Sequence, residues 1–136
     1  MNTKHEGIVR TWVCQIENDN YVVVFEWDTR KHMVKALNKK YWNVRGPKCN
    51  KNTRAAYHTF RSNTNARTLK IKPLRYGEIH VVKDDYGVGV AAHEIQHIVC
   101  NYALAKGWDM ERDNEKIALI SGDMTYWFWI GQQKGQ

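Results

Sequence analysis

Several features that would assign a chain to a particular class are missing from this sequence of 136 residues. No apolar run approaches the length of about 18 residues that predicts a membrane-spanning helix. The first six residues, Met-Asn-Thr-Lys-His-Glu, lack the apolar core of a signal peptide. The three cysteines, at positions 14, 49 and 100, form no Cys-x-x-Cys pair and leave one over, which favours a reducing compartment. We therefore expect a cytoplasmic protein with no membrane partner.

Acidic residues are absent between Arg30 and Arg75, a stretch that holds 14 lysines and arginines. The rest of the chain holds 7 basic and 14 acidic residues, so the block carries +14, the remainder −7 and the whole chain +7. Such a block attracts phosphate backbones, and residues 30–75 are compatible with contact to nucleic acid or to an acidic protein partner. The other interpretation is a solvated basic face, or one balanced by acidic residues in the fold. The expected nucleic-acid contacts are Lys48, Lys51, Arg54 and Arg61.

The length and a hydrophobic content of 43% suit one domain, residues 1–136, with a single core. Strands are predicted where β-branched and aromatic residues gather, and helices where apolar residues recur with helical spacing. The expected elements are a hairpin of residues 7–17 and 21–28, a helix over 30–42, a loop over 48–67 with at most a short strand near Ala55-Ala56-Tyr57, strands over 69–74 and 78–83 around a turn at 75–77, and two later helices.

The stretch His93-Glu94-Ile95-Gln96-His97 carries the clearest chemical pattern. Histidines four residues apart lie on one helical face, because four residues turn a helix by about 400°. Both imidazoles can then reach one Zn²⁺ at about 2.0–2.1 Å. Glu94 lies about 100° further round, where its carboxylate can take a proton from the attacking water and pass it to a leaving amine. H-E-x-x-H is the signature of the zincins.

The helix around this motif has one polar arc of about 100°. That arc holds Val90, His93, Glu94, His97, Asn101 and Leu104. The opposite side is apolar and consists of Ala91, Ala92, Ile95, Ile98, Val99, Tyr102 and Ala103. We therefore expect a largely buried helix whose single polar stripe binds the metal. Cys100 lies outside the arc and is predicted to be a packing residue, and the aspartates of Asp84-Asp85 can cap the start of the helix.

A zinc site of this kind needs a third protein ligand, and the chain has no histidine after His97. Metzincins, which use a later histidine, are therefore excluded, and SprT-like proteases are disfavoured for the same reason. An acidic turn (Asp109, Glu111, Asp113) is followed by Asn114-Glu115 and a predicted helix over 115–130, capped by Asp113 or Asn114. Here the chain resembles the gluzincins, the thermolysin-like class, and within them small metallopeptidases of phages and prophages.

The resemblance covers roughly Tyr76 to Trp129, about two fifths of the chain. It implies Glu115 as the third ligand of one Zn²⁺, and a phage-encoded or bacterial cytoplasmic metalloprotease. Thermolysin-like enzymes place an aspartate four residues after that glutamate, where it supports a ligand histidine. This chain has Leu119 there, so the residue that would support the histidine is unassigned, with Asp123 as one candidate. Ala118 and Gly122, on the face of Glu115, suggest that the two late helices pack closely at the metal.

Substrate contacts are less well defined by the sequence. In zincins a strand beside the site binds extended substrate through main-chain hydrogen bonds, and residues 78–83 are the candidate because they precede the metal helix. The donor that stabilises the oxyanion is unassigned among Tyr86, Tyr102, Tyr126 and His80. For His80 the favoured interpretation is a structural or an exposed position on its strand.

The sequence as a whole thus predicts a single zincin-like α+β domain. A small mixed or antiparallel sheet should pack against the H-E-x-x-H helix and a second helix that carries the third ligand. The expected activity is hydrolysis of a peptide bond in a protein or peptide substrate, with water activated by Zn²⁺ and Glu94 as the general base. The alternative is a basic nucleic-acid-binding module whose metal site is structural or inactive. An open coordination position would separate the two, because structural zinc sites are closed.

Overall fold

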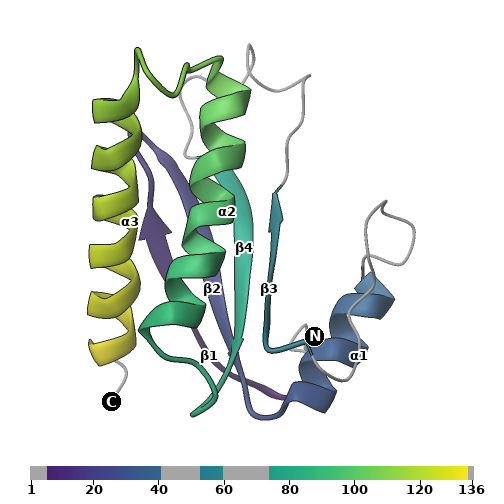
Figure 1. The fold of residues 1–136 in the computed structure, drawn as a ribbon. Coiled ribbons are helices and arrows are strands. Elements are labelled where there is room, and N and C mark those ends of the chain that lie inside the picture. The colour runs from purple at the N-terminus through teal and green to yellow at the C-terminus, as the bar shows by residue number, and fades with distance from the viewer. Residues whose placement is uncertain (1–5, 41–52, 60–73, 135–136) are drawn as a thin grey trace.

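The computed structural model describes residues 6–40, 53–59 and 74–134 (Figure 1). In chain order the elements are β1 (Ile8–Gln15), β2 (Asn20–Trp27), α1 (Arg30–Lys40), β3 (Ala55–Thr59), β4 (Leu74–Val82), α2 (Val88–Lys106) and α3 (Asn114–Lys134). The mixture of strands and helices confirms the α+β prediction at this level. Among the helices described, none combines the length and the apolar character needed to cross a membrane.

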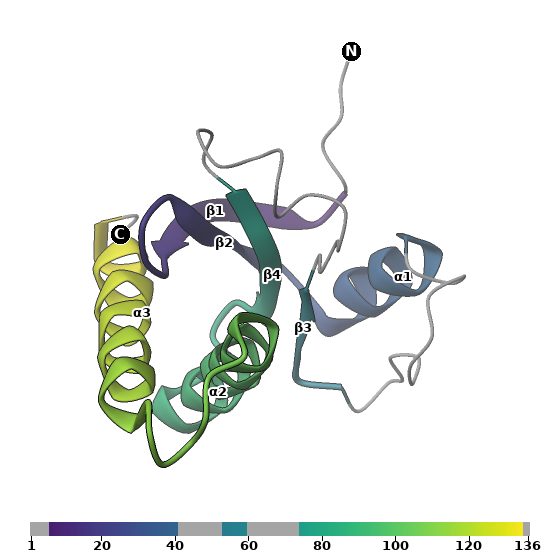
Figure 2. The same cartoon turned by 90° about the horizontal axis from the view of Figure 1, so that it is seen from above.

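The four strands form one mixed sheet in the order β1-β2-β4-β3. β1 and β2 pair as the predicted antiparallel hairpin. β2 and β4 run parallel, with α1 and β3 between them in the chain, and β3 pairs antiparallel with β4. α2 and α3 lie side by side against one face of the sheet, whereas α1 lies on the other side (Figures 1 and 2). β3 is therefore an edge strand of this sheet, and β4 is internal.

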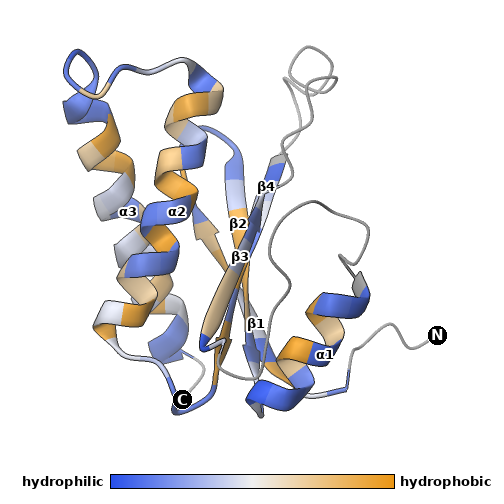
Figure 3. Cartoon of the chain, turned by 45° about the vertical axis from the view of Figure 1, so that its right-hand side comes forward, coloured by the Kyte–Doolittle hydropathy of each residue, from blue (hydrophilic) through white to orange (hydrophobic). Residues whose placement is uncertain are grey.

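Two apolar clusters hold these layers together. The larger one joins the sheet to α2 and α3 through residues such as Val24, Ile79, Ile98 and Phe128. The smaller one joins the opposite face to α1 and consists of Trp27, Met33, Leu37 and Val82 with their partly buried neighbours. Figure 3 shows hydrophobic positions along the sheet between the helices of the two faces. Burial on both faces explains why the central strands are rich in β-branched residues.

The turn predicted at residues 75–77 is wrong, because β4 runs without interruption from Leu74 to Val82. Its register with β2 shifts between Tyr21 and Val22, opposite Arg75 and Gly77. A strand can absorb such an irregularity as a bulge, and glycine is favoured there. A side chain at position 77 would also collide with β3, since an added Cβ would lie 2.3 Å from the carbonyl oxygen of His58. Residues 69–73 of the predicted strand lie outside the described residues.

The start of α2 also differs from the prediction. Its N-cap is Gly87, which makes no side-chain capping hydrogen bond. Asp85 does not cap the helix; its carboxylate instead accepts hydrogen bonds from Arg30 and Arg54. At the other end, Gly107 adopts the left-handed conformation and donates its N–H to Ala103 and Leu104, a common way to end a helix.

The orientation of α3 overturns the predicted role of Gly122. The helix buries Ile117, Ile120, Met124 and Phe128. Glu115, Ala118, Leu119, Gly122 and Tyr126, the face on which Glu115 lies, are exposed. A Cβ added at Gly122 would meet nothing within 4 Å. Close helix packing therefore does not require this glycine.

Candidate metal centre

His93 and His97 converge on one point beside α2. Their Nε2 atoms are 3.1 Å apart, and the planes of their rings are nearly perpendicular, at 84°. The spacing follows from the helix itself, because residues four apart are stacked one turn above another. Local geometry thus brings the two imidazoles to the same face of α2, whereas the rotation of each ring about its side-chain bonds depends on its neighbours.

The distance between these nitrogens suits a shared zinc ion. Two nitrogens at about 2.0–2.1 Å from a tetrahedral Zn²⁺ lie about 3.3–3.4 Å apart. The separation of 3.1 Å corresponds to a slightly narrower angle at the metal. The same separation fits an N–H···N hydrogen bond between the imidazoles, which an ion would replace. The two donors therefore fit Zn²⁺ as a pair.

The motif lies at the margin between the core and solvent. His93 is exposed and His97 is half-buried, whereas the side of α2 beside them exposes Ala92 and Cys100. The predictions of a largely buried helix and of a packing role for Cys100 are therefore wrong: α2 buries one side and presents the other to solvent. For a metal centre this placement leaves one imidazole open to ligands from solution.

Glu94 lies on the buried side of the motif and is only 6% exposed. Burial raises the pKa of its carboxyl above the ordinary value, an effect that the nearby charge of His93 opposes. Burial also lowers the pKa of His97, and the charge of His93 lowers it further. A buried carboxylate of raised basicity is suited to accepting a proton.

The sequence prediction missed Tyr57, the one aromatic residue that contacts the motif in the described part of the chain. Its ring stacks on the imidazole of His97, with centroids 4.4 Å apart and planes inclined by 13°. β3 brings it there, because this edge strand packs beside α2. The only signal for it in the sequence was the short apolar patch at Ala55-Ala56-Tyr57 within a polar, basic stretch.

Glu115 is not brought to the two histidines. In the described ranges 6–40, 53–59 and 74–134, no three His, Cys, Asp or Glu side chains are grouped so that they could hold one ion. His97 precedes the end of α2 by nine residues, about 13 Å along the helix axis, and Glu115 begins the next helix beyond that end. In addition, His97 faces β3, whereas α3 lies on the other side of α2 (Figures 1 and 2).

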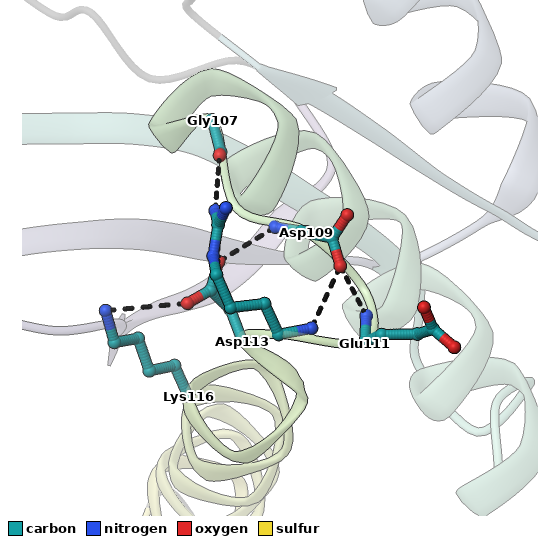
Figure 4. A network of polar contacts seen from close by, with 6 residues as sticks. Gly107, Asp109, Glu111, Asp113 and Lys116 are labelled. Carbon is teal, nitrogen blue, oxygen red and sulfur yellow. Dashed lines mark hydrogen bonds and ion pairs between the residues drawn. The ribbon is translucent and has the colours of Figure 1, made fainter.

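The acidic turn before α3 uses its carboxylates internally (Figure 4). Asp109 accepts hydrogen bonds from the backbone N–H groups of Glu111 and Arg112. Asp113 accepts from the N–H of Asp109 and from the guanidinium of Arg112, and Lys116 lies 3.7 Å from it. These contacts, Arg112 foremost, lower the pKa of Asp113. The turn therefore shapes the α2–α3 connection at the end of α2 remote from His93.

None of the four predicted oxyanion donors lies beside the histidine pair. The hydroxyl groups of Tyr86 and Tyr102 donate to Glu26 and Glu17, respectively. Tyr126 is on the exposed face of α3, as is Asp123, the candidate to support a ligand histidine. His80 is buried with Glu78 and Trp27 as hydrogen-bond partners and stacks on Phe25, which confirms the structural interpretation.

The strand predicted to bind substrate, residues 78–83, cannot do so as part of β4. Its main-chain groups pair with β2 on one side and with β3 on the other. The edge of the described sheet nearest α2 belongs instead to β3. The candidate edge for substrate binding is therefore β3, the strand that carries Tyr57.

Of the predicted nucleic-acid contacts, Lys48, Lys51 and Arg61 lie outside the described residues. Arg54 is engaged with Asp85, at 3.3 Å. Arg30 also pairs with Asp85, and Arg75 with the buried Glu78. Part of the basic block is therefore balanced by acidic residues from the rest of the chain. Three lysines differ from these paired arginines, because they line the exposed side of α1: Lys31, Lys35 and Lys39.

Comparison of the chain with protein-family models, with curated proteins and with solved structures found no match.

Proposed function

We propose that this protein is a zinc-dependent hydrolase of peptide bonds, with a zincin-like arrangement in which an edge strand, β3, runs beside the metal helix, α2. The observation that carries the proposal is the 3.1 Å approach of the Nε2 atoms of His93 and His97 beside the buried carboxylate of Glu94. When bound there, Zn²⁺ would lower the pKa of a water molecule and polarise the substrate carbonyl.

In this proposal Glu94 is the general base and not a metal ligand. Its carboxylate leaves the helix about 100° from His93 and lies on the buried side of the motif. It would accept a proton from the attacking water and return it to the leaving amine. A base that burial has made more basic holds the transferred proton better than a solvated carboxylate does.

The position of β3 at the edge of the described sheet supports a peptide as the substrate class. An extended peptide can add to an exposed sheet edge through main-chain hydrogen bonds. β3 runs beside α2, and the ring of Tyr57 on this strand stacks on the imidazole of His97. A peptide added to this edge would therefore pass the two imidazoles in an extended conformation.

A catalytic zinc site has three protein ligands in addition to its open position, and the described residues bring two together. Glu115 remains the ligand that the sequence resemblance implies. For Glu115 to serve, the first turn of α3 would have to unwind or move around the end of α2. The third ligand is therefore the first target for experiment.

The proposal is tested by measuring zinc content and cleavage in the same preparations. Native mass spectrometry with elemental analysis should find one zinc per chain in the wild type and much less in His93→Ala. A proteome-wide cleavage assay then identifies substrates for the zinc-loaded protein. A wild type that binds no zinc under saturating conditions would overturn the proposal.

The second candidate, a nucleic-acid-binding module with a structural or inactive metal site, is supported by the basic side of α1. Lys31, Lys35 and Lys39 recur every four residues, so they form one exposed stripe. The pairing of Arg30, Arg54 and Arg75 with acidic residues weakens this candidate, because paired guanidinium groups offer less charge to phosphates.

A further inference from the structure

Among the described residues, Tyr57 is the aromatic residue whose ring stacks on the histidine pair, through His97. The ring centroids of Tyr57 and His97 are 4.4 Å apart and their planes are inclined by 13°. Tyr57 occupies the middle of β3, paired with Ile79 of β4, and the residue is 37% exposed. One face of the ring thus covers His97 from the direction of the sheet edge.

The alternation of β3 explains which way Tyr57 points. Ala55, two residues earlier, packs with the α2 and α3 cluster, whereas Ala56 packs with the α1 cluster on the other face. Because side chains alternate along a strand, Tyr57 shares the face of Ala55 and points toward α2. The contact with His97 therefore follows from strand register.

The imidazoles have no other partner of this kind within the described ranges. The two rings contact each other and Tyr57, and no hydrogen bond reaches either Nδ1 atom from the residues that the structure describes. Metal-bound histidines are usually oriented by a hydrogen bond to the second ring nitrogen. In this chain the described contact that can orient His97 is the aromatic ring stacked on the face of its imidazole.

We propose that Tyr57 is a positioning residue: its ring holds the imidazole of His97 in the orientation that directs Nε2 toward the Nε2 of His93. This inference rests on the proposed function, because orientation of the ring matters when the two nitrogens share an ion. Because the effect comes from the flat ring, phenylalanine at position 57 should orient His97 as tyrosine does, whereas leucine should not. A ring that orients a ligand lowers the entropy lost on metal binding.

The experiment compares zinc affinity, by competition with a chromophoric chelator, for the wild type, Tyr57→Phe and Tyr57→Leu. Tyr126→Leu is the matched control, since Tyr126 is exposed on α3 and lies away from the histidines. We expect Tyr57→Leu to weaken zinc binding about 10- to 100-fold, as outer contacts of metal ligands commonly do. Tyr57→Phe and Tyr126→Leu should stay within about twofold of the wild type on the same reasoning.

Two readouts on the metal-free protein separate orientation from stability. Thermal unfolding should be similar for Tyr57→Phe and Tyr57→Leu if Tyr57 acts on the ligand and not on the fold. In nuclear magnetic resonance spectra, the carbon-bound ring protons of His97 should move downfield in Tyr57→Leu, because the ring current of Tyr57 is lost. Tyr57→Phe should leave those shifts near their wild-type positions.

Each outcome has a distinct meaning. Wild-type zinc affinity in Tyr57→Leu would overturn the positioning role and leave the proposed function intact. Equal loss in Tyr57→Phe and Tyr57→Leu would also overturn it, since the hydroxyl group and not the ring would then be responsible. Absence of zinc binding by the wild type would refute the proposed function, and the positioning role with it.

Discussion

Gly131 of α3 lies directly against the indole ring of Trp12 in β1: a Cβ added at position 131 would be 2.1 Å from Trp12 Cδ1. The approach is close because α3 packs on β1, with Phe128 edge-on to the same indole. This contact, and not the one expected at Gly122, is where a glycine is needed for close packing.

The two glycines give a matched pair of variants. Gly131→Ala should destabilise the domain by about 1–3 kcal/mol, because the added methyl group has to displace the Trp12 ring. Gly122→Ala should be neutral or stabilising by up to about 1 kcal/mol, since alanine favours an exposed helix interior. Urea unfolding measures both. A Gly131→Ala protein as stable as the wild type would contradict the packing described for α3.

Metal content should distinguish the two histidines from Glu115. Alanine at His93 or His97 removes one of the two converging nitrogens, and zinc should be largely lost. Glu115→Ala should retain zinc, because Glu115 is exposed and α3 lies on the side of α2 opposite β3 (Figure 2). Elemental analysis at equal protein concentration measures this.

Loss of zinc in Glu115→Ala would instead support the ligand set that the resemblance implies, and would require the start of α3 to rearrange. Alanine at Asp113 is the control for the acidic turn, since its carboxylate is held by Arg112 and Asp109. His5 and Cys49 are the two ligand-type side chains outside the described residues, and their variants complete the scan.

Glu94→Gln tests the general base. The amide is nearly the same size as the carboxylate but cannot accept the proton, so hydrolysis should fall about 10²- to 10⁴-fold. Zinc content and thermal stability should be maintained because His93 and His97 are unchanged. The measurement is turnover of a substrate from the cleavage assay, with Gln96→Ala, on the exposed side of α2, as the control. Unchanged turnover in Glu94→Gln would refute the proposed mechanism.

The lysine stripe of α1 predicts the salt dependence of any binding to DNA. If Z phosphates are neutralised, the logarithm of affinity falls with the logarithm of salt concentration at a slope of about −0.9Z. Replacing the stripe (Lys31, Lys35 and Lys39) with glutamine should flatten this slope. The control is an equal change of charge elsewhere, with glutamine at Lys83, Lys106 and Lys134, and it should flatten the slope less. A variant with glutamine at Lys48, Lys51, Arg54 and Arg61 tests the rest of the basic block in the same way. No binding at low salt would remove the nucleic-acid candidate.

Buried Cys14 predicts a loss of stability in alkali. Its thiol donates to the carbonyl of Met124, and burial raises its pKa from 9.0 to about 12. Between these values the unfolded chain releases a proton that the folded chain keeps, so stability falls as the pH rises from about 9 toward 12. Burial raises the pKa values of Tyr86 and Tyr102 as well, which adds to the loss above pH 10.

The variant Cys14→Val removes the first of these titrations while keeping the site apolar. Its free energy of unfolding, measured with urea at pH 7 to 10.5, should decline less steeply than that of the wild type. Cys100→Val is the control, because Cys100 is exposed. Parallel pH profiles for the wild type and Cys14→Val would show that the thiol of Cys14 ionises normally in the folded protein.

The sequence alone determined what depends on neighbours along the chain. The four-residue spacing of His93 and His97 places both imidazoles on one face of any α-helix. The hairpin of β1 and β2 and the end of α2 at Gly107 followed from local turn and capping preferences. The mixed α+β class was likewise predictable, because period-two and helical patterns occupy different stretches of the chain.

Tertiary structure decided everything that depends on which faces meet. Glu115 and Gly122 are exposed because Ile117, Ile120, Met124 and Phe128 bury the other side of α3, a choice that spacing within one helix leaves open. β4 became internal, and Tyr57 came to stack on His97, through pairing between strands far apart in sequence. Such long-range contacts depend on packing across the whole domain, so no local pattern at Tyr57 could have predicted its neighbour.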